Sequence, residues 1–372
     1  MRILVDYRAA LRARTGVGEY IHELARAYAS ASPTDDLILF SSSWKDRPAA
    51  GLASELGARV VDRRIPVSVL NLLWHRAEWP PVESLAGACD VAHAAHPLLL
   101  PATRAAQVVT IHDLFFLSHP ERTGAEVRRD YPVLAGDHAR RADAIITSSA
   151  HTRDLIADQF KVSPERIYVC PPGPPVWKTL GRGPNVPADG CILFIGTLEP
   201  RKNVGVLLDA YAELLRRVPG APRLVLAGRA TDEAAPWLQR LTGPPFRGHA
   251  EHLGYVSDDY RERLYAEARA LVLPSLDEGF GLPVLAAMSA GVPVVASRRG
   301  SLPEVVGSGG TLVDPSNAQE LAAALERLVT DNAWALAQAK AGLERARAFS
   351  WSTSAATLRG AYLDAIGRRR AR

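Results

Sequence analysis

Short apolar runs rich in β-branched residues alternate with longer amphipathic stretches along most of the 372-residue chain. In the first half, runs such as RILVDY (residues 2–7) read as buried strands, and the stretches between them carry apolar positions at helical spacing. Alternation of this kind predicts a parallel α/β sheet with helices on both faces. The predicted strands cover residues 2–7, 37–42, 58–65, 90–95, 107–113, 144–149 and 166–171, and the predicted helices cover residues 18–30, 131–141 and 151–160.

The alternation stops at residues 170–190, which contain six prolines and four glycines and can continue neither a helix nor a central strand. It then resumes, so we predict two doubly wound, Rossmann-like domains, 1–175 and 191–350, joined by a linker at 176–190. In open α/β sheets ligands bind beyond the carboxyl ends of the strands, which predicts a site in the cleft between the domains. The second domain's predicted strands cover 191–196, 223–228, 252–256, 270–275, 293–297 and 310–314, and its helices 204–218, 236–241, 260–270, the segment after Pro283, and 318–330.

Charge and cysteine content narrow the class of protein. The formal net charge is +4, with arginine in excess of lysine. These arginines could bind an anionic membrane surface or a phosphorylated substrate. Alternatively, they are solvated surface charges, some of them on a frayed tail. Three unpaired cysteines suggest neither a disulfide framework nor a zinc site, and no basic stripe interleaved with aromatics points to nucleic acid. This use of cysteine fits a reducing cytoplasm best, and because no apolar run approaches ~18 residues we expect no segment integral to the membrane. The basic residues gather in residues 2–14 and at Arg368, Arg369, Arg370 and Arg372.

A glycine turn, TGVGEY, follows the first predicted strand and opens a helix. Gly16 and Gly18 would let the backbone approach a phosphate closely, beside the free amides of the helix start. A dinucleotide fingerprint would need a third glycine where this chain has Ile21, so a nicotinamide enzyme is poorly supported. A turn with a purely structural purpose remains the alternative.

Two adjacent cations follow the strand at residues 191–196. Arg201 and Lys202 lie beyond the strand's carboxyl end and before a helix, where a planar guanidinium and a compact ammonium could neutralise a diphosphate. Solvated charges at a helix start are the alternative interpretation.

An acidic glycine turn, DEGFGLP, follows the strand at residues 270–275. Glu278 could accept hydrogen bonds from hydroxyl groups while the backbone of Phe280, Gly281 and Leu282 offers amides at a helix start. A glutamate that only caps the helix is the alternative.

In the first domain, His112 ends a predicted strand beside Asp113 and is a candidate for contact with reacting groups, although a lone histidine is more often structural. Ser149 and Thr152 suit capping of the following helix better than lining a site. No cysteine and histidine pair has metal-ligand spacing, so we expect no metal and no cofactor.

Taken in order, these landmarks resemble those of glycosyltransferase family 4, whose members have the GT-B fold. The resemblance runs from about residue 1 to 330 and rests on TGVGEY, TIHDL, RRADAIITSSAHTRDL, FIGTLEPRKN, HLGYVSDD, LPSLDEGFGLPVLAAMSAGVPVVAS and GSLPEVVGSGGTLVDP. It implies a retaining, metal-independent glycosyltransferase that takes a sugar from a nucleotide diphosphate donor. It also implies that a helix within residues 351–372, near 353–366, crosses back to the first domain.

The resemblance assigns roles to the candidate residues. Arg201 and Lys202 would clamp the diphosphate, and Gly16 and Gly18 would close on it from the first domain. Glu278, with the backbone of residues 280–282, would hold the donor sugar. His112 would contact that sugar near its anomeric centre. The turn at Tyr255 and Val256 would hold the base.

The chain departs from the family pattern at two positions. The family has two glutamates separated by seven residues, and the second, which usually holds the donor ribose, is Ala286 here. Thr197 stands where many members have an arginine, leaving Arg201 and Lys202 to carry the phosphate charge.

The motif forms are most similar to bacterial mannosyltransferases of surface-polysaccharide assembly, which implies GDP-mannose as donor and a saccharide or lipid-linked saccharide as acceptor. A UDP- or dTDP-sugar donor, a non-catalytic nucleotide-sugar-binding subunit and an epimerase are the alternatives. The apolar segment VSVLNLLWHRAEWPP (67–81) either meets a lipid-linked acceptor at the inner membrane face or packs in the core.

Overall fold

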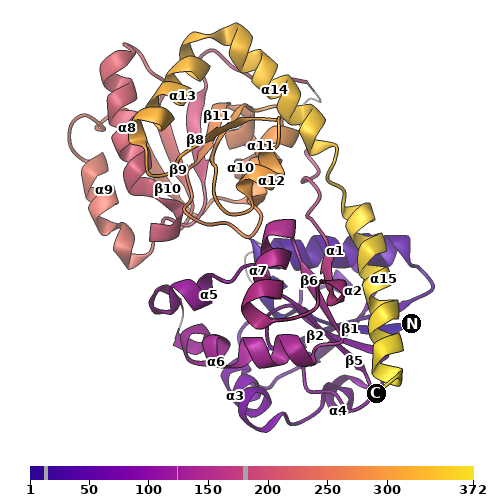
Figure 1. Cartoon of the computed structure of the whole chain (residues 1–372). Helices are drawn as coiled ribbons and strands as arrows, with labels where there is room; N and C mark the ends of the chain where they lie inside the picture. The colour runs from indigo at the N-terminus through magenta and orange to yellow at the C-terminus, as the bar shows by residue number, and fades with distance from the viewer. Residues whose placement is uncertain (12–15, 124, 179–182) are drawn as a thin grey trace. The chain divides into compact units, whose positions relative to one another are not determined.

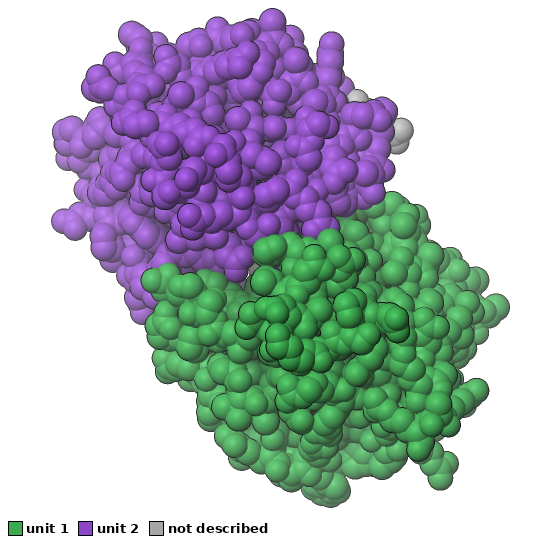
Figure 2. All heavy atoms as spheres, viewed as in Figure 1, with its two compact units in different colours: residues 1–173, 350–372 green, residues 174–349 purple. Residues whose placement is uncertain are grey.

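A computed structural model of the chain describes residues 1–11, 16–123, 125–178 and 183–372. These residues form two compact units, one of residues Met1–Gly173 with Ser350–Arg372 and one of residues Pro174–Phe349 (Figure 2). Each unit contains a parallel sheet with helices on both faces (Figure 1), which confirms the predicted α/β class. Within the described residues, no helix is both long and apolar enough to cross a lipid bilayer.

The first unit has a seven-stranded sheet in the order β3-β2-β1-β4-β5-β6-β7. Adjacent side chains of one strand enter different cores, because Ile3 packs on one face of the sheet and Leu4 on the other. The strands are β1 (Arg2–Asp6), β2 (Asp36–Ser42), β3 (Arg59–Arg63), β4 (Val91–Ala94), β5 (Ala106–Thr110), β6 (Ala144–Thr147) and β7 (Ile167–Val169). The helices are α1 (Val17–Ala31), α2 (Leu52–Leu56), α3 (Val67–Ala77), α4 (Val82–Ala86), α5 (Phe115–Ser118), α6 (Ala125–Arg141), α7 (Ala150–Phe160) and α15 (Trp351–Arg370).

The carboxyl-terminal helix α15 packs against α1 and against β5, β6 and β7 of the same sheet. It is longer at both ends than predicted, and its arginines bind the protein rather than fray. Arg368 donates to the carbonyl oxygens of Asp143 and Glu165, and Arg369 donates to that of Thr103. The frayed-tail interpretation is therefore wrong, because these guanidinium groups satisfy carbonyls at the amino ends of β5, β6 and β7.

The apolar segment at residues 67–81 contains α3 (Val67–Ala77), whose two sides lie in different environments. Leu70 and Trp74 are buried, and the Trp74 ring lies 5.8 Å from that of Phe40. On the other side, Val69 and Leu72 are about half exposed. One face of α3 thus belongs to the core, and the other presents apolar side chains to solvent.

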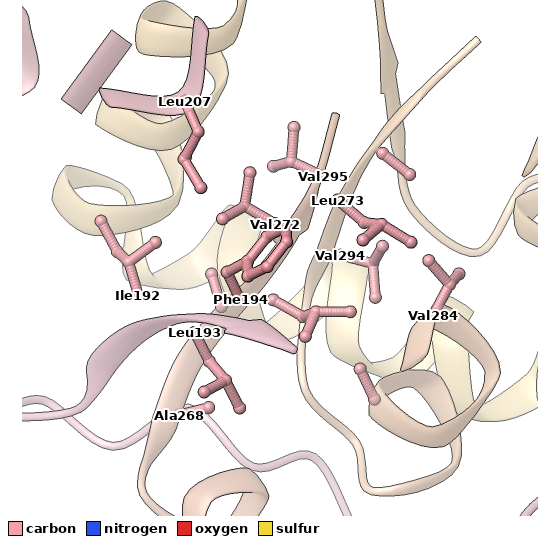
Figure 3. Close-up of a cluster of buried hydrophobic side chains, with 14 of the residues drawn as sticks. Ile192, Leu193, Phe194, Leu207, Ala268, Val272, Leu273, Val284, Val294 and Val295 are labelled. Atoms are coloured by element: carbon pink, nitrogen blue, oxygen red, sulfur yellow. The ribbon is translucent and has the colours of Figure 1, made fainter. Parts of the chain in front are cut away.

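The second unit has a six-stranded sheet in the order β10-β9-β8-β11-β12-β13. Its core is drawn in Figure 3, where Phe194 of β8 lies among Val272, Val295 and other side chains of neighbouring strands and helices. The strands are β8 (Cys191–Ile195), β9 (Leu224–Ala227), β10 (Ala250–Gly254), β11 (Ala268–Leu273), β12 (Val294–Ser297) and β13 (Thr311–Val313). The helices are α8 (Val204–Arg217), α9 (Ala235–Leu241), α10 (Asp258–Ala266), α11 (Leu282–Ser289), α12 (Leu302–Val306), α13 (Ala318–Thr330) and α14 (Asn332–Ala346).

Three details of this unit differ from the prediction. The helix expected at residues 260–270 is α10, which begins two residues earlier because the Ser257 side chain caps its amino end, and ends four residues earlier, just before β11. Arg269 belongs to β11 and donates to the carbonyl oxygens of Val329 and Pro187, so a charged side chain is buried inside a strand. Helix α14 was not predicted at all.

Candidate functional site

A buried group of charged side chains lies at the carboxyl ends of β8 and β11. Glu278 follows β11 and is only 6% exposed, and Lys202 ends a 3-10 turn, Pro200–Lys202, that follows β8. Lys202 Nζ donates to Glu278 Oε1, and Arg201 NH1 donates to Glu278 Oε2 at 3.2 Å. Because β8 and β11 are neighbours in the sheet, two motifs that are far apart in sequence meet.

Side chains that sequence reasoning did not assign complete this group. Ser275 Oγ donates to Glu278 Oε1 at 2.7 Å, and Arg201 NH2 donates to Glu199 Oε1 at 3.0 Å. A carboxylate offers about four lone pairs, and the three donors Lys202, Arg201 and Ser275 leave one lone pair on Oε2 of Glu278. That oxygen can therefore accept one further hydrogen bond, of the kind a hydroxyl group donates.

The charge state of Glu278 follows from its surroundings. Burial acts to raise the pKa of its carboxyl, but the positive charges of Lys202 and Arg201 and their hydrogen bonds outweigh burial and hold the pKa below the usual 4.5. Arg201 also contacts the carboxyl group of Glu199, so Arg201 and Lys202 face two acidic side chains. An anion that binds Lys202 or Arg201 must therefore share these cations with Glu278.

The turn after Glu278 supplies open backbone donors. Gly281 has φ +99° and caps the amino end of α11, and a Cβ there would lie 2.5 Å from Leu302 Cδ2. Within the described part of the chain, the N–H groups of Phe280, Gly281 and Leu282 make no hydrogen bond. Since Gly281 is the cap, the interpretation of Glu278 as a capping residue is wrong.

A loop after β12, part of a motif to which sequence reasoning gave no role, supports this turn. Ser301 Oγ donates to the carbonyl oxygen of Glu278 at 2.8 Å, and the Ser301 amide donates to the same oxygen at 3.1 Å. Gly300 has φ +62°, and a Cβ there would lie 2.8 Å from the amide nitrogen of Glu278. The signal in the sequence was the GSLPEVV motif, in which Gly300 and Ser301 precede α12 and Pro303 is the second residue of the helix.

The remaining predicted residues of this unit lie farther along the same edge. Tyr255 and Val256 follow β10, two strands from β8, or about 10 Å across the sheet. The Tyr255 ring is about half exposed, and the Arg229 guanidinium lies 5.2 Å from its centroid. Ala286 is on α11 and is 8% exposed.

His112 lies just beyond the carboxyl end of β5 in the first unit. Its ring stands at right angles to that of Tyr20, with centroids 5.0 Å apart. Burial lowers the pKa of His112 to about 4, although the charge of Asp113 acts to raise it. The imidazole is therefore neutral at pH 7, with one nitrogen that donates and one that accepts.

The glycine turn begins the helix that carries Tyr20. Gly16, with φ +54°, precedes α1, and its carbonyl oxygen accepts from the Tyr20 amide at 3.0 Å. A Cβ on Gly18 would lie 2.7 Å from the carbonyl oxygen of Ala9, so only glycine lets α1 begin this close to the end of β1. The structure thus brings the glycine turn and His112 to one edge of the first unit.

Ser149 has the capping role that the sequence favoured, whereas Thr152 lies inside α7 and does not cap it. Ser149 Oγ accepts from the Thr152 amide at the start of α7. Thr152 Oγ1 also lies 3.4 Å from the carbonyl oxygen of His112.

Comparison with known proteins decides which family these sites belong to. A model of Glycosyltransferase Family 4 matches residues 14–175, and a model of glycosyl transferases group 1 matches residues 189–331. The O-antigen chain mannosyltransferase B of Escherichia coli is 32% identical to this chain, with 94% of this chain and 96% of that protein covered. The chain belongs to glycosyltransferase family 4.

Other relatives are similar over less of their length. The D-inositol 3-phosphate glycosyltransferase of Stackebrandtia nassauensis is 33% identical over 61% of this chain and 55% of that protein. A serotype-specific mannosyltransferase of Escherichia coli, WbdA, is 31% identical over 45% of this chain and 21% of that protein.

Solved structures establish the GT-B fold for this family 4 glycosyltransferase. The sucrose-phosphate synthase of Thermosynechococcus elongatus superposes with a TM-score of 0.76 at 21% identity, covering 97% of this chain and 98% of that one. WaaG, a glycosyltransferase involved in lipopolysaccharide biosynthesis, has a TM-score of 0.71 at 16% identity with the same coverage. Both matches span the two units of the chain.

Proposed function

We propose that this family 4 glycosyltransferase transfers mannose from GDP-mannose, with retention of configuration, to a saccharide or lipid-linked saccharide during cell-surface polysaccharide synthesis. The observation that carries the proposal is the 32% identity to an O-antigen chain mannosyltransferase over nearly the whole length of both chains. The grouping of Arg201, Lys202 and Glu278 supports it, since a nucleotide sugar needs cations for its diphosphate and acceptors for its hydroxyls.

The donor diphosphate binds Arg201, Lys202 and the open amides of residues 280–282. When the bond between the sugar and the phosphate breaks, negative charge develops on the leaving diphosphate and positive charge on the sugar. Cations and amides fixed in advance stabilise that charge, and one such donor is worth about 3 to 4 kcal/mol. This stabilisation needs no resident metal ion.

In this proposal the donor sugar contacts Glu278 of the second unit and His112 of the first. The lone pair left on Glu278 Oε2 accepts from a sugar hydroxyl, and the neutral imidazole of His112 contacts the sugar near its anomeric carbon. The acceptor hydroxyl attacks that carbon on the face from which the diphosphate departs, and its proton passes to a phosphate oxygen. One bond from the anomeric carbon to oxygen breaks as another forms on the same face of the sugar, and this same-face replacement retains the configuration.

The acceptor side of the site lies in the first unit, and the exposed apolar face of α3 meets the lipid of a lipid-linked acceptor. Val69 and Leu72, about half exposed, give that face its apolar character, and the more exposed Trp79 follows the helix. Leu72→Glu should lower the rate with a lipid-linked acceptor and leave the rate with a water-soluble saccharide unchanged. Equal loss with both acceptors would contradict this role for α3.

A thermal-stability screen with GDP-, UDP- and dTDP-sugars tests the choice of donor. A ligand that binds only the folded protein raises the melting temperature by mass action. GDP-mannose should stabilise the protein, and mannose should appear on a saccharide acceptor. Selective stabilisation by a UDP- or dTDP-sugar would replace the proposed donor, and conversion of the sugar without any acceptor would indicate an epimerase.

Ala286 favours a second candidate, a non-catalytic nucleotide-sugar-binding subunit. A carboxylate bonded to ribose hydroxyls contributes about 1.5 to 3 kcal/mol, so its absence weakens donor binding by roughly ten- to a hundredfold. Titration calorimetry with GDP-mannose, beside an assay for released GDP, separates the two candidates. Binding without release in the presence of saccharide acceptors would favour the binding subunit.

A further inference from the structure

The imidazole of His112 is held by packing rather than by hydrogen bonds. Within the described part of the chain, no group hydrogen-bonds to either ring nitrogen, and Nε2 is buried. Most buried polar groups have a partner, so this nitrogen is an exception. Its ring partner is Tyr20, at 5.0 Å and 89°.

The Tyr20 side chain is itself fixed at both ends. It is 2% exposed, and its hydroxyl donates to the carbonyl oxygen of Cys170 at 2.8 Å. The ring of Trp351 lies 5.8 Å away, inclined by 56°. A buried ring with an anchored hydroxyl keeps one rotamer, so the surface that it presents to His112 is constant.

Cys170 and Trp351 belong to the segments by which the chain leaves the first unit and returns to it. These segments touch inside that unit, because a Cβ on Gly173 would lie 2.5 Å from both Cδ1 and the amide nitrogen of Trp351. Ser354 Oγ also donates to the carbonyl oxygen of Pro171. Tyr20 therefore contacts the outgoing segment with its hydroxyl and the returning segment with its ring.

We propose that Tyr20 is the positioning residue for His112. Because Tyr20 is itself held by Cys170 and Trp351, the orientation of the imidazole depends on the two segments that connect the units. The consequence for catalysis rests on the proposed contact between His112 and the donor sugar. Tyr20 acts only through the imidazole, so removing its ring matters only while His112 is present.

The first test reads the imidazole directly and needs no substrate. In full-length protein with 13C-labelled histidine, the His112 signal among ten histidines is assigned by its loss in His112→Ala. Tyr20→Met should shift that signal and Tyr20→Phe, which keeps the ring, should shift it less. Tyr28→Met is the matched control: Tyr28 is a buried tyrosine on the same helix, but its ring packs on Tyr362 instead. An unchanged His112 signal in Tyr20→Met would overturn the proposal.

The second test is a double-mutant cycle on release of GDP from GDP-mannose. Misplacing a reacting group by about 1 Å can cost up to a hundredfold, so Tyr20→Met should lower kcat by about 10- to 100-fold, with little change in KM. Adding Tyr20→Met to His112→Ala should cause no further loss. If the double mutant instead has a kcat lower than that of His112→Ala by the factor that Tyr20→Met causes alone, Tyr20 acts independently of the imidazole, and the proposal is overturned.

The two tests separate failure of the positioning role from failure of the proposed function. If the wild type releases no GDP, or if His112→Ala keeps full activity, the proposed function fails while the His112 signal still decides whether Tyr20 positions the ring. Melting temperatures identify any variant that does not fold. Tyr20→Leu then replaces Tyr20→Met with the same readouts.

Discussion

Lys202 donates its ammonium hydrogen bond to the carboxylate of Glu278, and this ion pair joins two loops that are 76 residues apart in the chain. Both side chains are mostly buried, and Arg201 and Ser275 donate to the same carboxylate. A buried charge is costly unless it is paired, so removing either partner leaves the other uncompensated. The pair therefore affects stability as well as donor binding.

Replacing Lys202 by alanine tests the phosphate-binding role. Loss of one pre-placed donor to a developing charge costs about 10²- to 10³-fold in kcat, and we expect a loss of that size in GDP release from GDP-mannose. Lys178→Ala is the matched control, because Lys178 is 71% exposed in its side chain and pairs with Asp259. Near-normal turnover in Lys202→Ala would remove this lysine from the mechanism.

The pH dependence of stability should identify Glu278. The pKa of Glu278 in the folded protein lies below the usual 4.5. Ionised Glu278 therefore stabilises the fold at pH values above 4.5. This contribution is lost as the pH falls from 4.5 through the lowered pKa of the folded protein. Glu278→Gln should melt at a lower temperature than the wild type at pH 7, and the difference should shrink below pH 4.5. Glu267→Gln, at an exposed position, is the control. A difference that stays constant with pH would contradict the ion-pair account.

Restoring the family's second carboxylate should strengthen nucleotide binding. If Ala286 marks a missing ribose contact, Ala286→Glu should lower the Kd for GDP-mannose by about tenfold or more in titration calorimetry. Ala286→Leu adds volume without a carboxylate and should not lower it. Equal dissociation constants for Ala286→Glu and the wild type would mean that the ribose is held elsewhere.

A glycine contact next to the cation loop should limit substitution. A Cβ on Gly228 would lie 1.9 Å from the carbonyl oxygen of Gly196, and Gly228 has φ +144°. Gly228→Ala should therefore destabilise the protein in urea unfolding, with backbone strain alone costing about 1 to 3 kcal/mol. Gly360→Ala, on the exposed side of α15 with open space around it, should instead stabilise by up to about 1 kcal/mol. Equal effects of the two changes would refute the steric argument.

The periodicity of apolar residues was enough to predict the architecture. Strands buried on both faces read as continuous apolar runs, and the amphipathic stretches between them read as helices, so the α/β class follows from local pattern. Motifs at the ends of strands also placed Arg201, Lys202 and Glu278 at one edge of the second unit's sheet and His112 at the end of a strand of the first, because the carboxyl ends of parallel strands lie at one edge of their sheet.

Local pattern was less reliable where tertiary contacts outweigh it. Arg269 looked like part of a helix, but its guanidinium is buried against two carbonyl groups within β11. The terminal arginines looked like a frayed tail, but Arg368 and Arg369 donate to carbonyls that are distant in sequence. In both cases the partner is a backbone oxygen, which carries no signal in the sequence.

The sequence by itself determined which chemical groups stand at the ends of which strands. Only the tertiary structure decided how those groups pair: that Glu278 joins Lys202, Arg201 and Ser275 instead of capping α11, and that the His112 ring rests on Tyr20. The physical reason is that these contacts depend on strand order and side-chain direction. β8 lies beside β11 although other strands come between them in the chain, and α1 lies beside the end of β5.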